Sequence, residues 1–247
     1  MTTLAGSVAL VTGGNRGVGK ALVEELLERG ATKVYAGVRT PSEPAPDGAE
    51  RVQLDITDPA QVAAAAAACG DVSVLVNNAG LHANTRLVLT DDETAARDEM
   101  EVNYFGTLAM TRAFAPILGR NGGGVIVNVL SVAAVVPAAF MGGYSPSKAA
   151  MWFLSTITRA ELAQQGTQVT SLVLGSVDTR MAAHVAGNKE DPRDIARIGL
   201  DGVEAGTLTV ATDKMAIDSM AAHTADPERF ERQLAKLLHV TQLRAPG

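Results

Sequence analysis

Short runs of apolar, largely β-branched residues recur along the chain and predict buried strands. Within each run the apolar residues are continuous rather than alternating with polar ones, which is typical of parallel strands covered on both faces. The predicted strands span residues 8–12, 34–38, 52–54, 72–76, 125–130, 169–174 and 208–211. Together they predict a parallel sheet with helices packed on its two faces.

Helical patterns fill the segments between these strands. Val18, Leu22 and Leu26 repeat at helical spacing, and Gly30 follows as a stop signal. Asp58 precedes a second helical stretch as its N-cap, with a proline at the first helical position. The predicted helices span residues 18–29, 59–69, 91–117 and 145–165.

The alternation of strands and helices sets the fold class. We predict an α/β protein, a Rossmann-type doubly wound parallel sheet with helices on both faces, in a single domain spanning residues 1–247. Residues 212–247 are assigned to a helical tail of the same domain, with a polar helix capped near Asp226. A break in the third helix is expected around Asn103.

Composition narrows the function. The net charge of −6 argues against a nucleic-acid or anionic-membrane surface, and the 47% of hydrophobic residues supports a large core. Cys69 is the single cysteine, so an internal disulfide is excluded and a reducing, cytoplasmic location is expected. The N-terminus lacks the basic start of a signal peptide. The histidines show no metal-ligand spacing, so no metal is expected at the site.

A glycine-rich turn follows the first predicted strand. The segment 12–19 reads TGGNRGVG and opens a predicted helix, whose free N–H groups and positive dipole suit a pyrophosphate. Its glycine spacing, Gly-x3-Gly-x-Gly, resembles the pattern of the short-chain dehydrogenase/reductase (SDR) family. The resemblance extends over residues 5–211 and leaves the C-terminal tail unmatched.

Two arginines bear on the choice of nicotinamide cofactor. Arg39 follows the second strand, where enzymes that prefer NAD carry an acidic residue, and no acidic residue occurs before Glu43. A guanidinium suits a 2′-phosphate, and Arg16 in the glycine turn is a second candidate. The resemblance implies NADP(H) in preference to NAD(H). The alternative is that both arginines are solvated surface charges.

Tyr144 and Lys148 lie one helical turn apart at the start of a predicted helix. Free tyrosine has a pKa of about 10, and a nearby ammonium is expected to lower it toward the range useful for acid–base catalysis. The SDR motif Tyr-x3-Lys, with an upstream serine and asparagine, is matched by Tyr144, Lys148, Ser131 and Asn103. The resemblance implies that Tyr144 is the proton donor and that Ser131 binds the substrate oxygen. It further implies that Lys148 lowers the pKa of Tyr144 and bonds the nicotinamide ribose, and that Asn103 supports a water-linked proton path.

The same resemblance implies the residues that contact the cofactor. Asp55 is expected to bond the adenine, with a turn or cap residue as the alternative, and the amides of the NNAG segment 77–80 are expected to join strand ends as well. Leu174 stands where the family has proline. The predicted cofactor contacts are Gly13, Asn15, Arg16, Gly17, Val18, Arg39, Asp55, Ile56, Asn77, Ala79, Gly80, Val129, Tyr144, Lys148, Gly175, Val177, Thr179 and Met181.

These residues predict an NADP(H)-dependent oxidoreductase that acts on a small-molecule carbonyl or secondary alcohol. The loop 132–141 is nearly all apolar and either lines the pocket or packs on the core, while residues 180–190 are a candidate lid with Met181 and His184 facing the substrate. A homodimer is expected through residues 104–118 and 145–165, with a homotetramer as the alternative. The alternative functions are a non-catalytic NADP-binding sensor or scaffold and an interaction module built on the tail.

Overall fold

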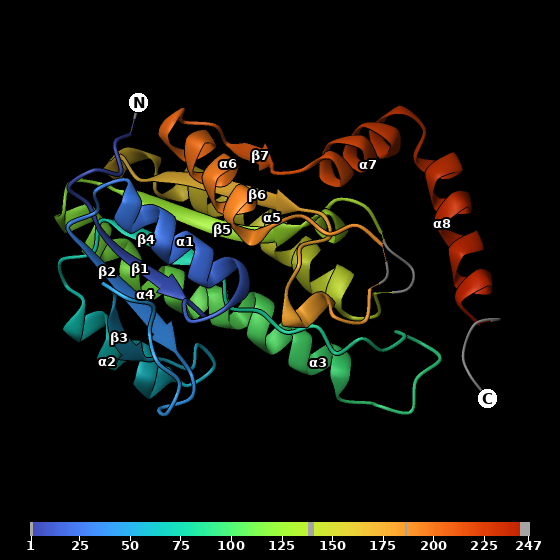
Figure 1. The fold of residues 1–247 in the computed structure, drawn as a ribbon, viewed down its shortest axis with the longest axis horizontal. Helices are drawn as coiled ribbons and strands as arrows, with labels where there is room; N and C mark the ends of the chain where they lie inside the picture. Colours follow the sequence, from blue (N-terminus) through green and yellow to red (C-terminus); the bar gives the residue numbers. More distant parts are fainter. Residues whose placement is uncertain (1, 138–140, 186, 243–247) are drawn as a thin grey trace.

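One parallel sheet organises the molecule. The computed structural model describes residues 2–137, 141–185 and 187–242, and the side chains of 237–242 are outside the description. Seven strands pair in the order β3-β2-β1-β4-β5-β6-β7, all parallel (Figure 1). The strands are β1 (Val8–Thr12), β2 (Lys33–Val38), β3 (Glu50–Gln53), β4 (Val74–Asn77), β5 (Val125–Ser131), β6 (Gln168–Leu174) and β7 (Thr209–Ala211). The predicted fold class is confirmed.

Helices cover both faces of this sheet. The helices are α1 (Gly17–Glu28), α2 (Pro59–Ala68), α3 (Ala95–Met100), α4 (Thr107–Arg120), α5 (Tyr144–Glu161), α6 (Pro192–Glu204), α7 (Lys214–Ala225) and α8 (Pro227–Gln242). Helices α1 and α6 pack together on one face, while α2, α4 and α5 cover the other. Helix α8 lies against α7, at the end of the molecule away from α1 (Figure 1). Within the predicted tail, α7 and α8 are helical, and residues 243–247 lie outside the described residues.

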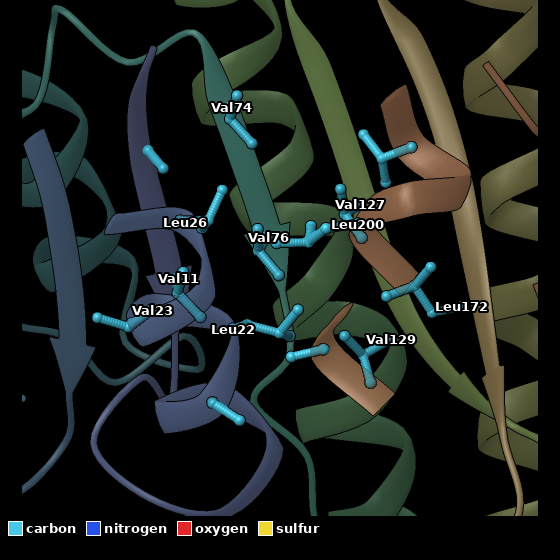
Figure 2. Close-up of a cluster of buried hydrophobic side chains, with 14 of the residues drawn as sticks. Val11, Leu22, Val23, Leu26, Val74, Val76, Val127, Val129, Leu172 and Leu200 are labelled. Atoms are coloured by element: carbon cyan, nitrogen blue, oxygen red, sulfur yellow. The ribbon is translucent and has the colours of Figure 1, made fainter. Parts of the chain in front are cut away.

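The alternation of side chains along each strand divides the core between the two faces. On the α1/α6 face, Leu22 and Leu26 of α1 and Leu200 of α6 project toward strands β4, β5 and β6 (Figure 2). On the other face, Ile126 of β5 packs beside Phe114 of α4. Each fully buried side chain of this size contributes roughly 1.5–3 kcal/mol, so both helical layers are fixed by burial of apolar surface.

The strand order reverses direction between β1 and β4. The chain proceeds from β1 through β2 to β3 on one side, then returns to place β4 on the other side of β1. In open parallel sheets the crevice at the carboxyl ends of the strands, at such a reversal, is where ligands bind. The loops that follow β1, β2, β4, β5 and β6 all leave the sheet at this edge.

Two helical segments differ from the simple prediction. The break expected around Asn103 is a stretch of π-helix, Glu101–Gly106, between α3 and α4. Sequence analysis assigned no element to residues 192–204, which form α6. The signals for α6 were present, because Asp191 caps the helix through a bond from the Arg193 N–H at 2.8 Å and a proline opens it.

Buried amides join two central strands to a helix, as expected for Asn77. The Asn77 Nδ2 donates to Asn128 Oδ1 at 2.9 Å, and the Asn128 Nδ2 donates to Ser155 Oγ at 2.8 Å. Ser155 in turn donates to the Met151 carbonyl within α5. All three polar side chains are buried, so each bond satisfies a group that water does not reach.

Replacing Asn128 by alanine should destabilise the protein by about 2–4 kcal/mol, because it removes from the core both the acceptor for Asn77 Nδ2 and the donor to Ser155 Oγ. Ser155→Ala is the matched control: it removes one partner only and should cost about 1 kcal/mol. Denaturant unfolding followed by circular dichroism measures both. An Asn128→Ala variant as stable as the parent protein would show that the network contributes nothing.

Candidate active site

Tyr144 and Lys148 begin helix α5 beside the end of β5. Glycine precedes the helix because the chain turns sharply there: Gly142 has φ of 45°, and a Cβ on it would collide with the Thr85 carbonyl. Lys148 reaches across to β5, where its Nζ donates to the Val129 carbonyl at 3.1 Å. Tyr144, Lys148 and Ser131 are all buried. Tyr144 is hydrogen-bonded to Ser131, and Lys148 Nζ lies 5.7 Å from the Tyr144 ring centroid, so the structure brings the predicted trio together.

The expected direction of the Tyr144 pKa is wrong for this structure. Burial raises the pKa of Tyr144 to about 12, the negative charge of Glu99 acts in the same direction, and a hydrogen bond with Ser131 opposes them. Lys148 does not reverse this, because its Nζ lies 5.7 Å from the Tyr144 ring centroid and donates to a backbone carbonyl. Burial likewise lowers the pKa of Lys148 to about 8.

The Asn103 side chain is fully buried and links two segments of this site by hydrogen bonds. Its Oδ1 accepts from the Leu81 N–H at 2.8 Å, and its Nδ2 donates to the Leu81 carbonyl at 2.9 Å and to Ser147 Oγ at 2.8 Å. Ser147 donates to the Tyr144 carbonyl at 2.8 Å. The side chain thus fixes the segment after β4 to the first turn of α5, and its role in a proton path stays a prediction.

A second group of polar side chains adjoins Tyr144, and sequence reasoning missed all of its members except His184. The His82 ring lies 4.8 Å from the Tyr144 ring, and the His184 ring lies 5.4 Å from that of His82. Burial and the neighbouring His184 lower the pKa of His82. Glu99 is buried, accepts from the Ala83 N–H at 2.7 Å, and has its pKa raised by burial. No spacing in the sequence marks these residues, because they meet only in space.

The candidate lid is anchored at its base. The Asp178 N–H donates to the Glu190 carbonyl at 2.9 Å, and the Glu190 N–H donates to the Ser176 carbonyl at 2.9 Å. The His184 ring adjoins the ring of His82, which in turn adjoins Tyr144, so His184 faces the site as expected. Met181 is 43% exposed. Residue 186 lies outside the described residues.

The apolar loop after β5 packs on the core over its described part. Ala134, with Val132 and Val135, joins Met151 of α5 and Val173 of β6 in one apolar cluster. Of the two alternatives for this loop, core packing therefore holds for residues 132–135. Residues 138–140 lie outside the described residues.

The glycine turn after β1, residues 12–19, leads into the start of α1 and is called the glycine cradle below. Gly13 and Gly17 have φ of 62° and 51°, which favours glycine at both positions. Arg16 is the N-cap of α1 and forms no side-chain cap bond, so its side chain leaves the first N–H groups of the helix free for an anion. Thr12 Oγ1 accepts from the Asn78 and Ala79 N–H groups at 2.9 and 3.0 Å. These two bonds join the turn to the NNAG segment.

Other predicted cofactor residues lie around this cradle. A Cβ on Gly80 would lie 3.1 Å from Asn103 Oδ1 and 3.5 Å from Lys148 Nζ, so Gly80 runs between two site residues. Thr179 lies against Gly17, with 3.1 Å from its Cγ2 to a Cβ built there. Val18 packs against the α1/α6 core, and Val177 is buried in it.

The carboxylate of Asp213 holds the turn after β6, and sequence analysis did not single it out. The Gly175 N–H donates to Asp213 Oδ2 at 2.6 Å, and a side chain at residue 175 would collide with the carboxylate. Asp213 also caps α7 by accepting from the Ala216 N–H. In the sequence, the Asp-x2-Ala start of a helix predicts that Asp213 is an N-cap. It does not show that the same carboxylate also binds Gly175, which is distant in the sequence.

The remaining predicted cofactor residues include polar side chains. Arg16 and Arg39 are exposed, and neither forms an ion pair within the part of the chain that the structure describes. Asp55 Oδ1 accepts from the Thr57 N–H and hydroxyl at 3.0 and 2.7 Å, which is the turn alternative, and its adenine contact stays a prediction. Ile56 is buried against Gly106 of the π-helical segment.

Comparison with known protein families identifies the chain. The family model described as short chain dehydrogenase matches residues 7–190. This chain belongs to the short-chain dehydrogenase/reductase family. Relatives of this chain are named as dehydrogenases and reductases, and one was solved in complex with NADP.

Relatives of known structure and activity agree with this assignment. A short chain dehydrogenase from Burkholderia cenocepacia J2315, crystallised in complex with NADP, is 43% identical with a TM-score of 0.90, and the match covers 94% of this chain and 99% of that one. The 3-alpha-(or 20-beta)-hydroxysteroid dehydrogenase of Mycobacterium tuberculosis is 32% identical over 238 residues, 90% of this chain and 89% of that protein.

Two relatives share 36% identity with this chain, and the match spans less than half the length of each. One is human 17-beta-hydroxysteroid dehydrogenase type 2, where 190 aligned residues cover 70% of this chain and 48% of that protein. Across residues 2–137, 141–185 and 187–242, no helix is long and apolar enough to cross a membrane, and no three His, Cys, Asp or Glu side chains are arranged to hold a metal ion.

Replacing Lys148 by methionine should stabilise the cofactor-free protein at pH 7. The pKa of Lys148 falls from 10.5 to about 8 on folding, and a difference of that size corresponds to about 3 kcal/mol. The variant removes this cost together with the bond to the Val129 carbonyl, so the free energy of unfolding should rise by about 1–2 kcal/mol.

The advantage should disappear as pH rises through the window from about 8 to 10.5, where the unfolded chain keeps the Lys148 proton that the folded chain has released. Denaturant unfolding of both proteins at neutral and alkaline pH measures this. A methionine variant that is less stable than the parent at pH 7 would contradict the account.

Proposed function

We propose that the chain transfers a hydride between NADP(H) and the carbonyl or secondary alcohol of a small, largely apolar substrate, by a Ser131–Tyr144–Lys148 mechanism with Asn103 in support. The observation that supports it most is the joint burial of Ser131, Tyr144 and Lys148 beside β5, at the same edge of the sheet as the glycine cradle.

The residues present fit a dinucleotide. The cradle at Gly13 and Gly17 and the start of α1 would hold the pyrophosphate, and the free guanidinium groups of Arg16 and Arg39 would bind a 2′-phosphate. When bound, the nicotinamide supplies or accepts the hydride. The NADP complex of the Burkholderia relative supports NADP as the cofactor.

Each member of the trio has a task that follows from its surroundings. Tyr144, with a pKa of about 12, keeps its proton at neutral pH and can donate it to a carbonyl oxygen during reduction. Ser131, hydrogen-bonded to Tyr144, would hold that oxygen and stabilise the charge that develops on it. Lys148, with a pKa of about 8, is largely protonated at neutral pH and brings positive charge to the site. In the oxidation direction, positive charge around Tyr144 must increase to lower its pKa.

The proposed substrate class rests on the names of two relatives and on the side chains that lie near Tyr144. The names of the Mycobacterium and human relatives refer to hydroxysteroids, which carry a hydroxyl on a large apolar body. In this chain the rings of His82 and His184 extend from Tyr144, so the substrate would meet polar rings near its reacting group. We retain a carbonyl or secondary alcohol with an apolar body as the substrate class.

A homodimer through residues 104–118 and 145–165 is part of the proposal, together with a cytoplasmic location. Phe153 and Ile157 lie one turn apart on α5 and are 68% and 56% exposed. Apolar side chains of this size on a helix face favour burial against a second copy. The homotetramer has no comparable support.

Tyr144→Phe should lower kcat/KM for NADPH-dependent carbonyl reduction by at least about 100-fold, because phenylalanine has no proton to donate. The Kd for NADPH should change little. Tyr104→Phe is the matched control: it removes the same hydroxyl from a tyrosine outside the trio and should leave turnover unchanged. A Tyr144→Phe variant that keeps more than about a tenth of the activity would refute the role of the phenol.

A parent protein that binds NADPH but reduces no carbonyl compound would favour the non-catalytic sensor instead.

A further inference from the structure

The carboxylate of Glu43, in the loop after β2, lies beside the glycine turn. The parallel register pairs Thr12 with Gly37, so the turn after β1 and the loop after β2 emerge side by side. The residues that follow β2 in such folds face the ribose 2′ position of a dinucleotide. Here Asn15 of the turn donates from Nδ2 to Glu43 Oε2 of the loop at 2.8 Å.

The loop holds Glu43 in this place. Its backbone N–H donates to the Thr40 carbonyl at 3.1 Å, and Arg51 Nη1 donates to the Pro41 carbonyl at 2.6 Å. Residues 40–47 contain three prolines, which restrict the backbone further. Glu43 is half-buried and bonds the neutral Asn15 amide rather than either exposed arginine. Its negative charge therefore stays uncompensated by an ion pair among the described residues.

We propose that Glu43 is a residue that determines cofactor specificity: anchored by Asn15, it sets a negative charge against the 2′-phosphate that Arg16 and Arg39 attract. NADPH carries that phosphate and NADH carries a neutral hydroxyl at the same position, so Glu43 weakens the binding of NADPH selectively. The preference for NADPH is then smaller than two arginines alone would give, and NADH remains a usable cofactor. The proposal rests on the proposed function, because it assumes that the cradle binds a dinucleotide.

Glu43→Gln separates the charge from the hydrogen bond. A glutamine carbonyl oxygen can still accept from Asn15, so the turn keeps its shape while the negative charge is lost. Asp47→Asn is the matched control, since it removes the same charge from the same loop at an exposed residue that forms no ion pair among the described residues. The probes are NADPH and NADH themselves, titrated against the full chain by nucleotide fluorescence or calorimetry.

For Glu43→Gln we expect the Kd for NADPH to fall about three- to tenfold, while the Kd for NADH changes less than about twofold. The gain should shrink as salt is raised from low to high ionic strength, because exposed charges are screened. Asp47→Asn should change both dissociation constants by less than about twofold. An unchanged Kd for NADPH, an equal change for both nucleotides, or an equal effect of Asp47→Asn would overturn the proposal.

Arg39→Ala in the same titrations keeps the two proposals apart. Loss of NADPH affinity with little change for NADH supports Arg39 as a 2′-phosphate ligand. If Arg39→Ala has no effect, the proposed basis of NADP preference fails, while a selective gain in Glu43→Gln still supports Glu43. If neither nucleotide binds the parent protein at millimolar concentration, the proposed function and the role of Glu43 both fail.

Discussion

The buried ammonium of Lys148 is the interaction on which the site depends. In the part of the chain that the structure describes, its partners are the Val129 carbonyl and the sulfur of Met151, and no carboxylate contacts it. Burying a cation with so little compensation is unfavourable, and the lowered pKa of Lys148 expresses that cost. The sheet and α5 must therefore be stable enough to hold it, and the buried Asn77–Asn128–Ser155 bonds fasten them together at this point.

Hydrogen bonds of polar side chains join the other segments of the site, which are far apart in sequence. Asn103 joins the loop after β4 to α5, Thr12 joins the glycine turn to the NNAG segment, and Asp213 holds the turn after β6. In each case a single buried or half-buried side chain satisfies backbone groups that the strands leave unpaired where they end. These bonds position parts of the loops at the carboxyl edge, and catalysis by orientation and electrostatics requires such positioning.

The fold could be predicted because local patterns determine it. Continuous apolar runs identified all seven strands, and the break near Asn103 was expected where π-helix occurs. The sequence motifs also identified Ser131, Tyr144 and Lys148, which the structure brings together. The direction of the Tyr144 pKa was mispredicted, because helical spacing shows that two side chains share a face but not that burial outweighs their attraction. His82, Glu99, Asp213 and the placement of Glu43 beside Asn15 were missed, because these contacts exist only after distant loops meet.

The central claim is that this edge of the sheet carries out hydride transfer to a carbonyl carbon. The most direct measurement uses NADPH deuterated at the transferable C4 position, incubated with a panel of ketones and aldehydes, with the products analysed by mass spectrometry. The account predicts that NADPH is consumed and that the alcohol product carries one deuterium on its carbinol carbon. Tight binding of NADPH with no deuterated alcohol from any member of the panel would contradict it.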